Sequence, residues 1–168
     1  MNYGVNKMEY IKIGKIVNTH GIKGEIRILS DFKYKKLVFK KNFPIYIGPD
    51  KKPEIVESYR VHKMFDMITL NGILNINDVL KYKGLFVYID KSSLDVIYEE
   101  DYIGLEAYTD HYVGVVSEII KGKAQDLIVV TNKKKKYMIP NIEEFVKKID
   151  LKNKKIYIQS IKGLIDED

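Results

Sequence analysis

Side chains able to do covalent or metal chemistry are few in this sequence and lie far apart. His20, His62 and His111 form no pair at the i,i+4 spacing that places two imidazoles on one helix face, and no carboxylate stands at the spacing of a metal site. The serines lack the setting of a nucleophile elbow, and no glycine-rich loop ends in Gly-Lys-Ser or Gly-Lys-Thr. We therefore expect a binding protein that is not an enzyme and that needs no metal or cofactor.

Two charged runs could hold ions, and each also has a simpler interpretation. The acidic run from Glu99 to Asp101 could coordinate a cation, but we interpret it as part of a solvated linker. The run Lys133 to Lys136 could grip phosphates, but a charged hairpin tip that protects a sheet edge explains it better. Neither run is therefore among the candidate sites.

Candidate binding residues gather around one glycine-bearing connection, Asn18 to Gly24. Two glycines three residues apart suit a loop that needs positive φ twice, or one whose backbone approaches a ligand closely. Freed backbone N–H groups and neighbouring cations could meet an RNA backbone, whereas a plain hairpin connection explains the spacing too. His20 could stack on RNA, or it could only fix the loop. The candidate RNA-binding residues are Lys15, Asn18, Thr19, His20, Gly21, Lys23, Gly24 and Arg27.

The segments on either side of this connection alternate apolar and charged residues, which is the period of a half-buried strand. In the return segment Ile26 and Ile28 should face inward and Arg27 outward. The isoleucines of the first segment do not share one strict register, which predicts a bulge or bend near Gly14. The connection should therefore be the tip of a β-hairpin.

Composition predicts a globular, cytoplasmic protein with an anionic partner. The 168 residues are 45% hydrophobic and 31% charged, include no cysteine, and contain no apolar run near the roughly 18 residues that span a bilayer. Residues 1–91 contain seventeen Lys and Arg against nine Asp and Glu, a net charge of +8, whereas residues 92–168 contain twelve against fourteen, a net charge of −2. The first half is therefore expected to meet nucleic acid. An AT-rich genome could also produce this excess of lysine.

Short alternating segments continue along both halves of the chain. The first half should contain about six strands in a small closed barrel, with strands at 44–49, 54–63, 67–70 and 85–89. Ser30 or Asp31 could cap a short helix, and Asn75 to Gly84 carries the signals of another. The lysines at 33–41 alternate with aromatic and aliphatic residues, which fits either RNA contact or a solvated face. The second half should form a smaller barrel from strands at 106–108, 112–120, 127–131, 137–140, 146–150 and 156–158.

A change of character near Asp90 marks the boundary between the two halves. Residues 90–100 are acidic, include two adjacent serines and have no sustained period. We expect a first domain at 1–90, a linker at 91–100 and a second domain at 101–168.

Both halves also contain extended motifs of fixed residues. The first half has Gly14-Lys15-Ile16 and then Thr19-His20-Gly21-Ile22-Lys23-Gly24-Glu25-Ile26-Arg27. The second half has Asp101-Tyr102-Ile103-Gly104-Leu105, Gly114-Val115-Val116, Asp126, Ile139-Pro140, Ile149-Asp150-Leu151 and Gly163-Leu164-Ile165-Asp166. In this order the motifs closely resemble those of the RimM family of bacterial ribosome maturation factors, over nearly the whole chain.

The resemblance implies a mainly β protein with two small β-barrels in tandem and one or two short helices. The first would be a six-stranded, translation-factor-like barrel and the second a PRC-barrel. It further implies a non-enzymatic, monomeric assembly factor that binds the head of the immature small ribosomal subunit and promotes its maturation. Its partners would be the 16S rRNA and small-subunit ribosomal protein nineteen. The alternatives are a binding module outside ribosome assembly and, third, an RNA-modifying enzyme.

The resemblance also implies a protein-binding region at the entrance to the second barrel. The family usually has adjacent aromatics there, but this chain has Ile97 and Glu99 on either side of Tyr98, and Gln125 stands where asparagine is usual. From the charge split we expect the basic first barrel to meet rRNA and the second to meet the ribosomal protein. The candidate residues for the protein contact are Tyr98, Tyr102, Gln125 and Asp126.

Overall fold

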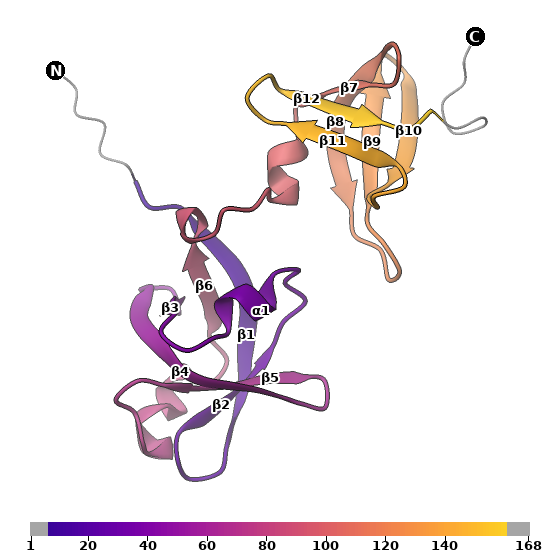
Figure 1. Cartoon of the computed structure of the whole chain (residues 1–168). Helices are drawn as coiled ribbons and strands as arrows, with labels where there is room; N and C mark the ends of the chain where they lie inside the picture. Colours follow the sequence, from indigo (N-terminus) through magenta and orange to yellow (C-terminus); the bar gives the residue numbers. More distant parts are fainter. Residues whose placement is uncertain (1–6, 161–168) are drawn as a thin grey trace, which may run out of the picture. The chain divides into compact units, whose positions relative to one another are not determined.

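The computed structural model describes residues 7–160, and β-strands form most of its regular structure (Figure 1). Contacts within the chain divide it into two units, Met1–Asp95 and Val96–Asp168, and each unit has its own sheet and its own core. The protein is therefore mainly β, with two six-stranded units and few short helices, as its sequence predicts.

The first unit is a closed barrel in the strand order β1-β2-β5-β4-β3-β6 (Figure 1). Closure comes from antiparallel pairing of β1 with β6, so no strand of this barrel is left as a free edge. The six strands are β1 Tyr10–His20, β2 Glu25–Leu29, β3 Pro44–Ile47, β4 Lys52–His62, β5 Phe65–Leu70 and β6 Phe86–Asp90.

Alternation along β1 and β2 sends Ile13, Ile16, Ile26 and Ile28 into the barrel. Ile16, Ile26 and Ile28 are fully buried, whereas Arg27 stays partly exposed. The register of β1 against β6 shifts between Lys12 and Gly14, which confirms the predicted bulge. Each fully buried isoleucine contributes about 1.5–3 kcal/mol to folding relative to an exposed one. This small core therefore depends on the strict in–out order of the strands.

The predicted cap of the first helix is wrong. Helix α1, Lys35–Val38, is a single turn whose N-cap is Tyr34, without a side-chain cap bond. The hydroxyl of Ser30 is used elsewhere: it donates to the carbonyl of Ile13 at 2.5 Å and accepts from the amide of Phe32 at 3.2 Å. These bonds tie the exit of β2 to β1, so the chain turns before the helix begins.

The segment after β5 forms two 3₁₀ turns, η1 Ile76–Asp78 and η2 Leu80–Tyr82, where the sequence predicts one helix. The predicted capping residue is correct, because Asn75 Oδ1 accepts from the amide of Asn77 at 2.8 Å. Val79 and Tyr82 are both buried, and residues three apart lie directly above one another in a 3₁₀ turn. Two buried contacts at this spacing favour the tighter helix.

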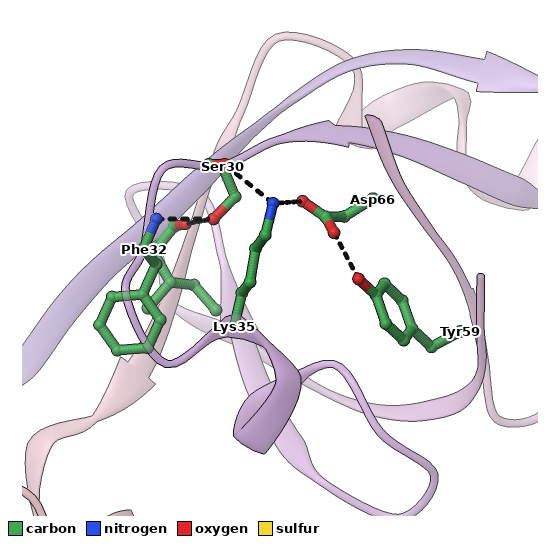
Figure 2. A network of polar contacts seen from close by, with 6 residues as sticks. Ser30, Phe32, Lys35, Tyr59 and Asp66 are labelled. Carbon is green, nitrogen blue, oxygen red and sulfur yellow. Dashed lines mark hydrogen bonds and ion pairs between the residues drawn. The ribbon is translucent and has the colours of Figure 1, made fainter. Parts of the chain in front are cut away.

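A charged network joins the α1 segment to the barrel. Asp66 on β5 is fully buried, and its carboxylate accepts from Lys35 Nζ at 3.1 Å and from the hydroxyl of Tyr59 at 2.6 Å (Figure 2). Burial, followed by the hydrogen bond to Asp66, raises the pKa of Tyr59 to about 12. The network therefore pins α1 over β4 and β5.

The second unit is one six-stranded sheet in the order β10-β9-β8-β7-β12-β11 (Figure 1). Its strands match the predicted segments to within two residues. β7 and β12 pair in parallel, and the other pairs are antiparallel. The strands are β7 Glu106–Tyr108, β8 Tyr112–Ile120, β9 Leu127–Asn132, β10 Lys135–Pro140, β11 Val146–Asp150 and β12 Lys155–Ile158.

The segment between the two sheets contains two further 3₁₀ turns, η3 Lys91–Ser93 and η4 Glu99–Tyr102. Thus part of the segment interpreted as a linker has local structure, including a side-chain cap in which Asp90 accepts from the amide of Ser92. The terminal motif at 163–166 lies outside the described residues.

Candidate functional site

The glycine-bearing connection is the tip of the β1–β2 hairpin, as predicted. Gly21 and Gly24 have φ angles of 67° and 87°, so both positions require the left-handed region that suits glycine. The carbonyl of Ile22 accepts from the amide of Ile76 at 3.0 Å. This bond ties the tip to the turn that follows β5, and the side chains at positions 22 and 23 of the tip remain exposed to solvent.

Arg27 and His20 bond to each other across this hairpin. Arg27 Nη2 lies 3.0 Å from His20 Nδ1, and the guanidinium carbon lies 5.1 Å from the ring centre of Phe65. A guanidinium can only donate, so Nδ1 of His20 must be the acceptor and a neutral His20 carries its proton on Nε2. This bond supports the interpretation that His20 fixes the loop, and it leaves Nε2 as the ring's donor.

Side chains of a second hairpin, β4–β5, reach those of the first, and β2 pairs with β5 between them. The ring of His62 lies 5.8 Å from that of His20. Arg60 forms a two-point ion pair with Glu25, with Nε–Oε2 and Nη2–Oε1 distances of 2.9 Å and 2.6 Å. The sequence predictions missed Arg60, His62 and Phe65, because only the sheet order β1-β2-β5-β4 brings them to this place.

We call these two tips together the hairpin surface, and it combines cations with exposed apolar side chains. Lys23 and Lys63 are the exposed lysines of the two tips. Ile22, Met64 and the neighbouring Leu74 are 79%, 69% and 84% exposed. Exposed apolar groups among cations are typical of a surface that contacts a partner.

Not every predicted RNA-binding residue lies at the hairpin surface. His20, Gly21, Lys23, Gly24 and Arg27 belong to it. Asn18 and Thr19 directly precede the tip on β1, and Asn18 Oδ1 accepts from the amide of Thr19 at 2.9 Å. Lys15 lies further down β1, opposite Phe86 on β6.

Replacing Lys63 with Asn is expected to raise the pKa of His62. Burial lowers this pKa, followed by the nearby charges of Arg60 and Lys63 and then His20 and Arg27. Lys63 has a φ of 55°, which asparagine tolerates, so the variant removes charge with little strain. An NMR titration of the imidazole C–H signals measures the shift, and Lys23→Asn is the matched control. An unchanged His62 pKa in Lys63→Asn would show that the charge of Lys63 does not lower the pKa of His62.

The residues expected to contact a protein are placed differently in the second unit. Tyr98 and Tyr102 are 7% and 5% exposed, so both rings are part of the interior. Gln125 is exposed and Asp126 is half-buried. Of the four residues, only those of the 125–126 loop present much surface to a partner.

Asp126 organises a polar cluster around that loop. Its carboxylate accepts from Lys121 Nζ at 3.0 Å and from the amide of Gly122 at 3.1 Å. Lys121 also pairs with Glu99, and Asn141 Nδ2 donates to Glu99 at 2.9 Å. Burial opposes ionisation of Asp126, but the bonds from Lys121 and Gly122 outweigh it and lower its pKa. Glu99 thus takes part in a charged network in the second unit.

Residues 7–160 bring together no group of three or more His, Asp or Glu side chains able to hold a metal ion. None of the helices within these residues is long and apolar enough to cross a membrane.

Comparison with known proteins identifies the family. Residues 11–94 match the model of the RimM N-terminal domain, and residues 99–164 match that of the RimM PRC barrel domain. The ribosome maturation factor RimM of Exiguobacterium sibiricum is 36% identical over 95% of this chain and 99% of its own length. The ribosome maturation factor RimM of Ligilactobacillus salivarius is 38% identical over 94% of this chain and 99% of its own length. The solution structure of the N-terminal domain of RimM from Thermus thermophilus aligns with a TM-score of 0.45 and 18% identity, over 54% of this chain and all of that one. The chain belongs to the RimM family of ribosome maturation factors.

Proposed function

We propose that this protein is a non-enzymatic assembly factor, which binds the head of the immature small ribosomal subunit and promotes its maturation. Its partners there are the 16S rRNA and small-subunit ribosomal protein nineteen, and it acts in the cytoplasm as a monomer without a cofactor. Family membership supports a role in ribosome maturation. The observation that carries the RNA contact is the hairpin surface, where cations from two adjacent strand pairs converge.

The physical mechanism is a shift of populations. A protein that binds one conformation of an assembling rRNA better than the others moves the equilibrium toward that conformation, by no more than its difference in affinity. No bond is made or broken, so no nucleotide is consumed.

The two units have different roles in this proposal, with a first domain at 1–90, a linker at 91–100 and a second domain at 101–168. The net charge of +8 in residues 1–91 suits a polyanion, and the net charge of −2 in residues 92–168 suits a basic ribosomal protein. On the second unit we assign the protein contact to Gln125 and Asp126, with Tyr98 and Tyr102 supporting that region from the interior.

Sedimentation of the full-length protein in lysate gradients tests the role in assembly. We expect it to migrate with free small subunits and not with translating ribosomes. Absence from the small-subunit fractions would instead favour a binding module that acts outside ribosome assembly.

Charge-changing variants test the assignment of the two units. Lys23→Ala together with Lys63→Asn is expected to weaken binding of a 16S rRNA fragment and to reduce the slope of log K against log salt by about 1.4, because each lost phosphate contact removes about 0.7. Gln125→Arg should leave RNA binding intact and weaken binding of the basic ribosomal protein by like-charge repulsion. If changes in both units reduced RNA affinity and salt slope equally, the assignment would be wrong.

A further inference from the structure

A second possible contact surface lies on the outside of the first barrel, where β1, β6 and β3 are neighbours. Lys12 on β1 is paired with Tyr88 on β6, which is in turn paired with Tyr46 on β3, so their side chains share the outer face. We call this surface the aromatic face, and it consists of Tyr10, Tyr46, Phe86 and Tyr88 with Lys12, Lys15 and Lys51.

The three tyrosine rings of the aromatic face form a continuous group. The ring centre of Tyr10 lies 5.1 Å from that of Tyr46 and 6.5 Å from that of Tyr88, with interplanar angles of 71° and 74°. Tyr10 and Phe86 remain 37% and 38% exposed although both belong to paired strands. Edge-to-face packing holds the tyrosine rings in place, and the exposed parts of Tyr10 and Phe86 leave ring surface available to a ligand.

Lysines stand directly over two of these rings. Lys12 Nζ lies 3.9 Å from the ring centre of Phe86, and Lys51 Nζ lies 4.0 Å from that of Tyr88. At an exposed site such a cation–π contact is weaker than the stacking of a nucleobase on an aromatic ring. A base can therefore displace the ammonium from the ring, and the released lysine is then close enough to pair with the phosphate of that nucleotide.

The charge of the surroundings selects an anionic occupant. The tyrosines Tyr108, Tyr112 and Tyr157 form a comparable group in the second unit, with centre-to-centre distances of 5.7 Å and 6.1 Å. There, however, the hydroxyl of Tyr108 donates to Glu106, and residues 92–168 carry a net charge of −2. The lysines near those rings are also more distant, since Lys155 and Lys148 lie 5.0 Å and 5.9 Å from the ring centres of Tyr108 and Tyr157. The aromatic face lies instead in the half with a net charge of +8. The acid at its end, Asp90, accepts from the amide and hydroxyl of Ser92.

We propose that the aromatic face binds unpaired nucleotides of single-stranded RNA, with bases stacked on Phe86 and the tyrosines and with phosphates held by Lys12, Lys15 and Lys51. The inference rests on the proposed function only in taking RNA as the partner, since the hairpin surface is a different site. It also gives a role to Lys15, which lies away from the hairpin tips. Two sites on one barrel would let the protein hold a strand and its neighbouring structured region together.

The test measures binding of the full-length protein to a fluorescent RNA decamer of adenosine and cytidine, and to the same decamer annealed to its complement. Phe86→Leu keeps an apolar side chain and is expected to weaken decamer binding roughly fivefold or more, the loss of one stacked base. Phe86→Trp, which keeps an aromatic ring, should retain decamer binding. Tyr112→Leu, at the exposed aromatic group of the second unit, is the matched control and should bind as the unchanged protein does.

Lys12→Ala gives a second readout, because it should reduce the slope of log K against log salt for decamer binding by about 0.7. Decamer binding unchanged in Phe86→Leu would overturn the proposal, even if Lys12→Ala weakened binding, because charge alone would then explain the affinity. If Phe86→Leu lost small-subunit association but still bound the decamer normally, the face would contact protein and the proposal would also fail. The two proposals can fail separately. If the unchanged protein did not migrate with small subunits, but Phe86→Leu still weakened decamer binding, the RNA site on the aromatic face would be supported and only the assembly role would be wrong.

Discussion

Gly114→Ala is expected to destabilise the second unit by about 3 kcal/mol, the upper part of the range for overpacking a well-ordered interior. A Cβ atom at position 114 would lie 2.5 Å from the carbonyl oxygen of Thr131 and 2.9 Å from its carbonyl carbon. Both are backbone atoms of β9, and β8 is itself held between β7 and β9. Because neither neighbour can move aside as a flexible side chain could, the alanine must disrupt the pairing of β8 with β9.

Peptide-level hydrogen exchange measures this effect separately in the two units. Amides of β8 and β9 should exchange faster in Gly114→Ala, while those of β1 to β6 should keep their protection. Gly104→Asn is the control for backbone strain without overlap, because a Cβ there meets nothing within 4 Å, whereas the φ of 90° is unfavourable for any side chain and least so for asparagine. Protection of β8 and β9 equal to that of the unchanged protein would mean that the sheet can accommodate the added atom.

Lys35→Met should lower the free energy of unfolding of the first unit by about 3 kcal/mol. The change leaves the carboxylate of Asp66 fully buried without its cation, and breaking a buried pair in this way typically costs about 3–5 kcal/mol. We expect a cost at the lower end of this range, because the side chain of Lys35 is itself 35% exposed. The remaining bond from Tyr59, 2.6 Å long, cannot replace the lost charge (Figure 2).

Urea unfolding of three variants separates the charge effect from the loss of packing. Lys36→Met, at an exposed position of the same helix, should change stability by less than about 0.5 kcal/mol. Lys35→Met combined with Asp66→Asn should recover part of the loss, since no uncompensated charge then remains buried. If the single and double variants were equally unstable, the cost would come from the packing of the lysine stem and not from the carboxylate.

Much of the candidate site could be read from local sequence, and the reason is periodicity. Alternation over β1 and β2 predicted the strands, the bulge near Gly14 and the inward isoleucines, because side chains on a strand must face opposite sides in turn. The spacing of Gly21 and Gly24 predicted two positive φ angles, because both requirements are local to the loop. The same reasoning located the strands of the second unit.

Local patterns failed where a residue's role depends on a distant partner. Ser30 looks like a helix cap, but it bonds to Ile13 across the barrel. The family resemblance, and no local pattern, suggested Tyr98 and Tyr102 as contact residues, and only the fold of the second unit shows that their rings are buried. The helix predicted after Asn75 is replaced by two 3₁₀ turns, because Val79 and Tyr82, three residues apart, must both reach buried positions.

By itself, then, the sequence determined the strands and the loop conformation, which depend on residues close together in the chain. It also determined the charge of each half and the family, which depend on composition and on the order of motifs and not on the fold. Only the tertiary structure placed His62 and Phe65 beside the first hairpin, buried Asp66 beneath Lys35, and brought rings from β1, β3 and β6 onto one face. These arrangements depend on which strands pair across the closed barrel. That pairing is set by the packing of the whole core, and no short stretch of sequence records it.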